Sequence, residues 1–215
     1  MFLLNNELIF PPLSMADENG LLAIGGDLSV ERLLLAYRSG IFPWYNEDDP
    51  ICWWSPDPRF VLYPAEMKIS NSMRTVLQNG KYRFTTNRAF NQVIQHCKTV
   101  PRDGQPGTWI SPAIQDAYTR LHELGYAHSA EAWCNGELVG GLYGVRLGNV
   151  FFGESMFNIM SNASKFAFIN YVHLLQKENV HLIDCQLHTN HLESLGARMI
   201  PRDLFIKILA ANTGQ

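Results

Sequence analysis

The sequence predicts an α/β protein of the α+β kind, with a small irregular N-terminal domain over residues 1–60 and a larger domain over residues 61–215. The chain has 215 residues, of which 47% are hydrophobic, enough for one large domain with a small appendage. Residues 10–60 are dense in turn formers and aromatic residues, whereas strand and helix patterns alternate regularly from Val61 onward. That alternation predicts a mixed, largely antiparallel sheet in the larger domain.

In the N-terminal domain the sequence predicts one short helix, over residues 30–40. Ser29 can cap this helix, Glu31 stands in its first turn, and Gly40 can end it. The rest of the domain is expected to be loop, because four prolines, at positions 43, 50, 56 and 58, exclude long regular structure.

The larger domain begins with strands and helices in turn. Its first three helices each start at a capping residue, Ser70, Asn87 or Ser111. A loop rich in glycine and proline over residues 101–111 precedes the third of them. In order, we expect a strand at 60–64, a helix at 70–80, a strand at 82–86, and helices at 87–100 and 111–125.

The second half of this domain contains a predicted antiparallel meander of three strands over residues 127–157, with hairpin turns at Asn135-Gly136 and at Gly148-Asn149. We then expect a helix at 162–179, a short buried strand at 180–186, a helical turn at 189–197 and a helix at 202–212. This order resembles the second half of a GNAT-type acyltransferase. The usual acyl-CoA phosphate loop of those enzymes does not occur in the sequence, so coenzyme A is not the expected donor.

The distribution of charge indicates a polyanionic partner, although the net charge is −3. Eight of the 17 basic residues lie between Arg59 and Arg102, where Glu66 is the only acid. Such a basic block suits a phosphate backbone, and the alternative is a solvated surface that happens to be basic. We expect a soluble cytoplasmic protein, because the N-terminus lacks a positive n-region and no apolar stretch reaches membrane-spanning length. The four cysteines contain no C-x-x-C pair and are expected as reduced thiols.

The stretch "LIDCQLHTNH", residues 182–191, carries several side chains capable of catalysis or metal binding. If the strand is regular, Asp184 and Gln186 share one face and Cys185 lies on the other, which favours a buried structural thiol for Cys185. Two neighbouring polar groups on an apolar strand indicate a cleft, and two satisfied structural hydrogen-bonding groups are the alternative. His188 and His191 form only a weak metal motif, because no further ligand cluster has suitable spacing.

Three other features can be interpreted either as packing or as functional. Glu154, in "FFGESMF", is expected beside aromatic residues and Met, although it could be an edge-strand charge. The tryptophans of the irregular segments suit the stacking of unpaired nucleotides, although a single tryptophan is more often packing; they are Trp44, Trp53, Trp54 and Trp109. A helical stripe usually belongs to the core but could wall an apolar pocket; its members are Phe168, Tyr171 and Leu175.

The motifs together resemble the leucyl/phenylalanyl-tRNA–protein transferase family over residues 10–203, in the order "GLLAIGGDLS", "GIFPWY", "WWSPDPR", "GTWIS", "AYTRLHELGYAHS", "LVGGLYGV", "FFGESMF", "NASK", "LIDCQ" and "HLESLGA". The resemblance implies a small N-terminal domain followed by a GNAT-like domain. It also implies transfer of Leu, Phe or, less readily, Met from aminoacyl-tRNA to proteins that begin with Arg or Lys, which creates a destabilising N-terminus for the N-degron pathway.

The resemblance assigns Asp184 and Gln186 as the catalytic pair and places Glu154 near the reacting end. Because a neutral amide is a very poor base, we expect Asp184 to orient Gln186 and both to align the acceptor amine. No cofactor or metal is expected, since the aminoacyl ester is already activated. By the same resemblance, Trp44 and Trp109 flank the terminal adenosine, and the pocket for the transferred side chain consists of Leu142, Phe151, Phe168, Tyr171 and Ile183.

Contacts with the tRNA are expected from Arg74, Lys81 and Arg83, although Asn71 and Thr75 stand where the family has basic residues. The expected state is a monomer.

Two rival functions stay open at this point. One is a ligase that attaches residues from aminoacyl-tRNA to cell-wall precursors, and the other is a tRNA-binding module without catalysis, which would leave the placement of Asp184, Gln186 and Glu154 unexplained.

Overall fold

The computed structural model describes residues 2–100 and 109–214. Its N-terminal part contains a four-stranded sheet, so the prediction of loop around the first helix was wrong. The prolines limit these strands to two to five residues and do not prevent pairing, and Pro43 lies on an edge strand. In spatial order the strands are β1 (Phe2–Leu4), β2 (Leu21–Gly25), β4 (Cys52–Trp54) and β3 (Phe42–Pro43).

The predicted N-terminal helix is confirmed as α1 (Val30–Arg38), with the Ser29 side chain accepting from the backbone N–H of Arg32. Gly40 follows it with a φ of +74°, a conformation that glycine adopts without steric cost. Short 3-10 turns at Leu13–Met15 and Pro64–Glu66 complete the first third of the chain.

The main sheet is mixed and largely antiparallel, as predicted: only the pairing of β10 with β9 is parallel. The strand β11 was not predicted, because three residues are too short for a periodic pattern. In spatial order the strands are β11 (Arg198–Ile200), β5 (Arg59–Leu62), β10 (Leu182–Gln186), β9 (Val150–Asn158), β8 (Glu137–Leu147), β7 (Ala127–Cys134) and β6 (Arg83–Thr86).

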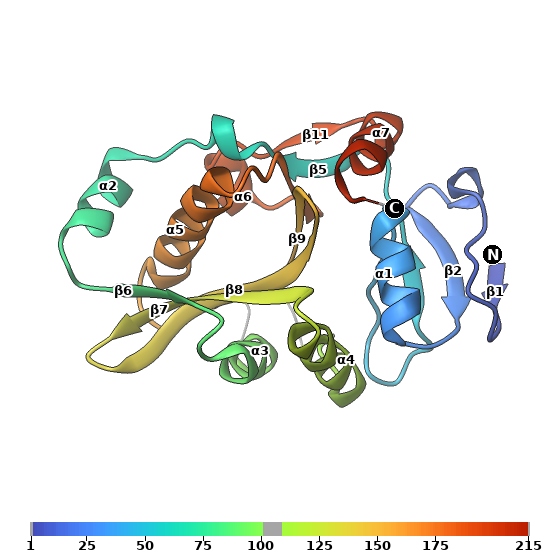
Figure 1. Cartoon of the computed structure of the whole chain (residues 1–215), viewed down its shortest axis with the longest axis horizontal. Helices are drawn as coiled ribbons and strands as arrows, with labels where there is room; N and C mark the ends of the chain where they lie inside the picture. Colours follow the sequence, from blue (N-terminus) through green and yellow to red (C-terminus); the bar gives the residue numbers. More distant parts are fainter. Residues whose placement is uncertain (1, 101–108, 215) are drawn as a thin grey trace.

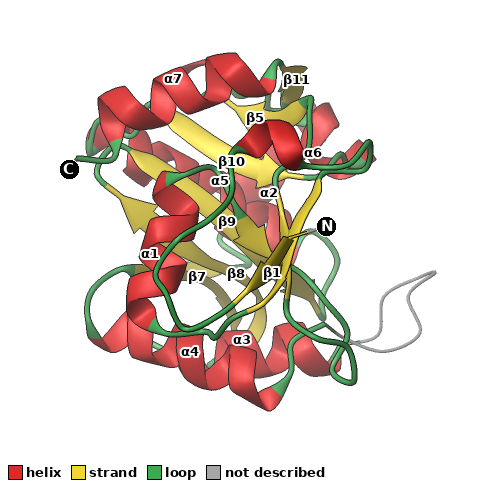
Figure 2. Ribbon diagram, turned by 90° about the vertical axis from the view of Figure 1, so that its right-hand side faces the viewer, coloured by secondary structure: helices red, strands yellow, loops and turns green. Residues whose placement is uncertain are grey.

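Helices cover both faces of the main sheet, and Figure 1 shows α5 on one side and α3 with α4 on the other. Viewed at right angles in Figure 2, α1 and β1 stand in front of the main sheet. The Ser70 and Ser111 caps are confirmed on α2 and α4. The remaining helices of the described chain are α2 (Asn71–Gln78), α3 (Phe90–Thr99), α4 (Pro112–Glu123), α5 (Ala163–Lys177), α6 (Asn190–Ser194) and α7 (Arg202–Asn212).

The predicted Asn87 cap of α3 is wrong. Asn87 has a φ of +57°, and its side-chain oxygen accepts the backbone N–H of Ser129 instead. The carboxylate of the fully buried Glu131 on β7 accepts the backbone N–H groups of Arg88 and Ala89 just before the helix. A side chain from a distant strand therefore replaces the local cap.

The N-terminal sheet and the main sheet share a continuous hydrophobic core, in which Tyr37 of α1 lies against Phe152 of β9. The predicted domain boundary at residue 60 falls within β5, a strand of the main sheet. The division of the chain into two domains stays a prediction. Within residues 2–100 and 109–214, every helix falls short of the length and apolar character that a membrane span requires.

Candidate active site

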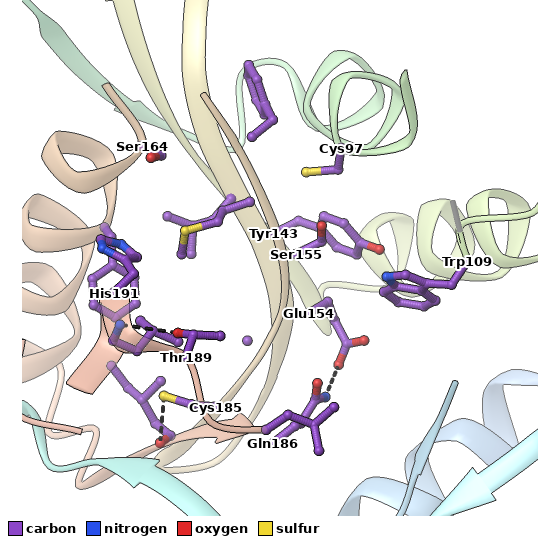
Figure 3. A pocket seen from close by; sticks show the side chains of 18 of the residues that line it. Cys97, Trp109, Tyr143, Glu154, Ser155, Ser164, Cys185, Gln186, Thr189 and His191 are labelled. Carbon is purple, nitrogen blue, oxygen red and sulfur yellow. Dashed lines mark hydrogen bonds between the residues drawn. The ribbon is translucent and has the colours of Figure 1, made fainter. Parts of the chain in front are cut away.

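A pocket of about 710 Å³ opens where β9 and β10 meet the N-terminal unit (Figure 3). The parallel pairing of β9 with β10 brings Glu154 and Gln186 to the same end of the sheet. Figure 3 shows them facing each other near Trp109, while His191 and Ser164 lie toward α5. The pocket therefore has a polar end at Glu154 and Gln186 and a more apolar end against α5.

Glu154 lies at a bulge: the register of β9 against β8 shifts between Ser155, opposite Tyr143, and Gly153, opposite Gly144. The bulge breaks the alternation expected for a regular strand. Both carboxylate oxygens of Glu154 are occupied by hydrogen bonds, which no local sequence pattern indicates.

The donors to Glu154 come from three distant segments. The Tyr37 hydroxyl donates to Oε1 at 2.7 Å and the Tyr118 hydroxyl to Oε2 at 3.0 Å. The side-chain amide of Gln186 donates to Oε1 at 3.0 Å, and the two tyrosine hydroxyls also contact each other. All three donors are neutral groups.

Burial raises the pKa of Glu154 to about 7, against the opposing effect of these three hydrogen bonds. The charge of Asp184 raises the pKa further. Burial and the charge of Glu154 also raise the pKa values of Tyr37 and Tyr118 well above the usual range, so both hydroxyls keep their protons. A carboxyl group with a pKa about 7 can change its ionisation under physiological conditions.

Asp184 does not line the pocket, so the prediction that it shares a cleft-facing side with Gln186 was wrong. It is 0% exposed and forms a bidentate ion pair with Arg59, with Nε to Oδ1 at 2.8 Å and Nη2 to Oδ2 at 2.7 Å. The alternation fails because Gln186 has a φ of +61° and the register against β5 shifts between these two residues.

Asp184 still controls Gln186 through the backbone, because Asp184 Oδ1 accepts the backbone N–H of Gln186 at 2.9 Å. Arg59, itself 1% exposed, lies between the rings of Phe42 and Phe205, each 4.7 Å from the guanidinium carbon, and donates to the carbonyl of Gly40. The ion pair therefore fixes the turn that aims Gln186 into the pocket.

Cys185 is half-buried: it packs against a hydrophobic cluster and also borders the pocket with Ile183, so the prediction of a core thiol is confirmed only in part. Burial raises the pKa of its thiol, and the nearby charge of Asp184 raises it further. The thiol is therefore protonated and is a poor nucleophile.

The apolar end of the pocket contains Leu142, Phe168 and Ile183, three of the five residues expected there. The other two, Phe151 and Tyr171, are buried behind this wall in the same hydrophobic cluster, with ring centroids 5.1 Å apart. They can shape the pocket only through the side chains in front of them.

His191 also borders the pocket, and within the described chain neither ring nitrogen has a hydrogen-bond partner. Burial, and to a lesser degree the charge of Lys165, lowers the pKa of His191 to about 4, so the imidazole is neutral. His188 lies apart from it, within 3.1 Å of Glu193. Among the described residues no group of three or more His, Cys, Asp and Glu side chains could hold a metal ion.

Two of the four tryptophans singled out in the sequence, Trp44 and Trp109, border the pocket. Trp44 is 37% exposed, and Trp54 supports it edge-on at 5.8 Å while its Nε1 donates to the Trp44 carbonyl. Trp53 is fully buried, and its Nε1 donates to the Gly25 carbonyl. Trp53 is therefore a packing residue.

Arg74, Lys81 and Arg83 are exposed, in agreement with a surface role. Arg59 is buried in its ion pair, so it does not belong to the basic surface predicted from the sequence. Arg102 lies outside the described residues. Lys81 and Arg83 border a second cleft, which lies away from the first pocket and does not include Arg74.

Comparison with known proteins identifies the family of the chain. A family model described as leucyl/phenylalanyl-tRNA protein transferase matches residues 61–210, and the model for the N-terminal domain of the same family matches residues 26–57. The chain belongs to the leucyl/phenylalanyl-tRNA–protein transferase family.

Relatives that carry the family name align along nearly the whole chain. The leucyl/phenylalanyl-tRNA–protein transferase of Syntrophobacter fumaroxidans is 58% identical, over 99% of this chain and 91% of its own length. That of Flavobacterium johnsoniae is 56% identical, over 97% of this chain and 99% of its own length. Among solved structures, a GCN5-related N-acetyltransferase from Kribbella flavida aligns at a TM-score of 0.38 with 8% identity, over 78% of this chain and 59% of that one.

Sequence reasoning missed Tyr37, Tyr118 and Arg59 as parts of this candidate site. Both tyrosines stand on the apolar faces of predicted helices, where they look like ordinary core residues. The one available signal was chemical: a buried tyrosine hydroxyl or guanidinium needs a partner, so each implied a polar group elsewhere in the core.

Proposed function

We propose that this chain transfers Leu, Phe and, less readily, Met from aminoacyl-tRNA to the N-terminal Arg or Lys of acceptor proteins, as a monomer in the cytoplasm. Membership of the family supports the reaction class. One observation carries the proposal: a half-buried glutamate with a pKa about 7 is hydrogen-bonded to a glutamine between an apolar pocket and an accessible tryptophan.

The donor fits the pocket in two parts. The terminal adenosine would lie against Trp44 and Trp109, because aromatic side chains stack on unpaired bases. The transferred side chain would enter the apolar end, where Leu142, Phe168 and Ile183 offer no hydrogen-bond partners. Polar amino acids would lose their bonds to water there without replacement, which favours Leu, Phe and Met.

The acceptor amine would bind at the polar end. In its ionised form Glu154 attracts an ammonium group, and the oxygen of the Gln186 side chain can accept an N–H while its amide nitrogen remains bonded to Glu154. Asp184 cannot touch the substrate, so it acts as a positioning residue through the backbone of Gln186. Holding the amine beside the ester carbonyl can supply several kcal/mol of rate enhancement.

The reaction then requires no covalent enzyme intermediate. The neutral amine nitrogen attacks the ester carbonyl carbon, a new C–N bond forms, and the C–O bond to the ribose breaks. The proton lost by the amine ends on the released ribose oxygen, relayed by the neighbouring ribose hydroxyl. Gln186 orients the amine, and Glu154 takes up the proton that the ammonium group loses before the attack.

The decisive experiment measures transfer of labelled amino acids from charged tRNA to peptides that begin with Arg, Lys or Ala. We expect transfer of Leu and Phe to the Arg and Lys peptides, weaker transfer of Met, and none to the Ala peptide. Gln186→Leu and Glu154→Gln should each lower kcat/KM at least about a hundredfold with a normal circular dichroism spectrum. Transfer to a cell-wall precursor in place of the peptides, or tRNA binding without any transfer, would replace the proposal with one of its rivals.

A further inference from the structure

A second cleft, of about 520 Å³, lies between β6, the start of α3 and the β7–β8 hairpin. Three cations line it: Lys81 and Arg83 at the start of β6, and Arg88 just before α3. Gln92 and Trp133 complete the wall that faces them. All three cations are exposed, and none takes part in the ion pairs found among the described residues.

The buried acid Glu131 does not form an ion pair with any of these cations. Glu131 lies beneath the cleft, fully buried, and its carboxylate accepts from the hydroxyls of Thr85 and Ser129 and from two backbone N–H groups. The cations are therefore available to pair with an anionic ligand from solution. Three unpaired cations around a concave surface suit an anion with several charges.

The remaining wall suits a sugar-phosphate chain better than a single small anion. The Trp133 indole is half-buried, and its Nε1 donates to Thr85 at 2.7 Å, which fixes the ring against the sheet. A fixed aromatic ring offers an apolar surface to a ribose, while Gln92 offers both donor and acceptor groups to its hydroxyls.

The helix α3 connects this cleft to the first pocket. Gln92, near the start of α3, borders the cleft, and Cys97 and Val100, at its other end, border the first pocket. From Gln92 to Cys97 and Val100 the chain advances by five and eight residues, which in an α-helix is about 8–12 Å. At about 3.4 Å per nucleotide of a stacked strand, this length corresponds to about two to four nucleotides.

We propose that this cleft binds the phosphate backbone of the donor tRNA about two to four nucleotides before the terminal adenosine, toward the junction of the single-stranded 3′ end with the acceptor stem. The inference rests on the proposed function, because it takes the terminal adenosine to occupy the first pocket. It assigns Lys81 and Arg83 to one continuous site and adds Arg88, Gln92 and Trp133. Arg74, which does not line the cleft, is not part of this site.

The first test measures the affinity for uncharged tRNA by fluorescence anisotropy over a series of salt concentrations. The double variant Arg83→Ala/Arg88→Ala is expected to lower the slope of log affinity against log salt by roughly 1.4–1.8. At 50 mM salt its affinity should fall at least about tenfold. The control, Lys177→Ala/Lys207→Ala, removes two exposed charges from α5 and α7 and should keep the wild-type slope. Equal slopes for the double variant and the wild type would overturn the inference.

The second test compares two donors, phenylalanyl-tRNA and phenylalanyl-adenosine, of which the latter lacks the phosphates. The cleft predicts that the ratio of kcat/KM for the tRNA donor to that for the adenosine donor falls at least about tenfold in Arg83→Ala/Arg88→Ala. An equal loss with both donors would show a structural defect and overturn the inference. If the wild type transfers from neither donor but shows cleft-dependent tRNA binding, the transferase proposal fails and the cleft stands.

Discussion

Asp184 and Glu154 are carboxylates on neighbouring strands, the first fully buried and the second half-buried at the pocket, and their surroundings differ in kind. Asp184 faces the permanent charge of Arg59, which holds both of its oxygens. Glu154 faces only two tyrosine hydroxyls and the amide of Gln186, and burial raises its pKa to about 7. Neighbouring strands thus carry a carboxylate that is paired with a permanent cation and one that can exchange a proton.

The difference indicates separate roles: Asp184 with Arg59 supports the site, and Glu154 takes part in the proposed chemistry. A guanidinium cannot lose its proton, so Arg59 holds Asp184 in place with a permanent charge and two hydrogen bonds. Neutral donors stabilise the half-buried carboxylate of Glu154 without fixing its charge, so Glu154 remains responsive to an approaching ammonium group. Substitutions around each carboxylate test this contrast.

The largest expected effect comes from breaking the ion pair. Arg59→Ala leaves the buried charge of Asp184 without a partner and should lower the free energy of unfolding by roughly 3–5 kcal/mol, measured by urea denaturation. The control replaces both partners with apolar residues, Arg59→Met with Asp184→Leu, and should recover much of the stability but not the transfer activity. If Arg59→Ala cost less than about 1 kcal/mol, the pair would not be the support that we infer.

The next effect depends on pH and distinguishes Glu154 from Asp184. The pKa of Glu154 is higher in the folded chain than in the unfolded one, so its contribution to stability is full at low pH and is lost as the pH rises through about 7. Glu154→Gln removes this loss. Between pH 5 and pH 8 it should therefore gain on the order of 2 kcal/mol over the wild type.

The measurement is thermal or urea unfolding of both proteins at each pH. Glu137→Gln, the same substitution at an exposed position, serves as the control and should shift stability by less than about 0.5 kcal/mol at either pH. A constant difference between Glu154→Gln and the wild type across this range would contradict the raised pKa.

The smallest effect tests the tyrosines. Tyr118→Phe removes a hydrogen bond that lowers the pKa of Glu154, so the pKa should rise and the pH midpoint of kcat/KM should move upward. The expected loss of stability is about 1 kcal/mol. Tyr126→Phe, at a half-buried tyrosine elsewhere on the chain, should leave the midpoint unchanged. A fall in activity at every pH with no shift of the midpoint would assign Tyr118 a merely structural role.

Features written in short stretches of sequence could be predicted. Ser29, Ser70 and Ser111 cap their helices because a cap and the N–H groups it binds lie within three residues. The hairpin at Asn135 and Gly136 followed from residues that accept a positive φ. Most elements of the larger domain could be placed along the chain for the same reason, since each carries its own periodicity.

The site was only partly predictable, because its decisive contacts join residues far apart in sequence. Arg59 and Asp184 are 125 positions apart, and Tyr37 and Glu154 are 117 apart. The alternation of side chains along β10 gave the wrong face for Asp184, because the positive φ of Gln186 breaks it, and nothing local predicts that value for a glutamine. The resemblance to a known family indicated which residues form the pocket. It did not indicate which of them line its surface, so the burial of Phe151 and Tyr171 behind the pocket wall was unexpected.

The position of Arg59 has a consequence for the synthesis of the chain. Its guanidinium needs Asp184, made 125 residues later, and the ring of Phe205, made later still. At roughly 5–20 residues per second, a nascent chain holds this arginine without its carboxylate for about 6–25 s. During that interval the turn at Gln186 does not yet exist. The polar end of the pocket can therefore form only after the chain has been synthesised through β10, even if the N-terminal sheet has folded by then.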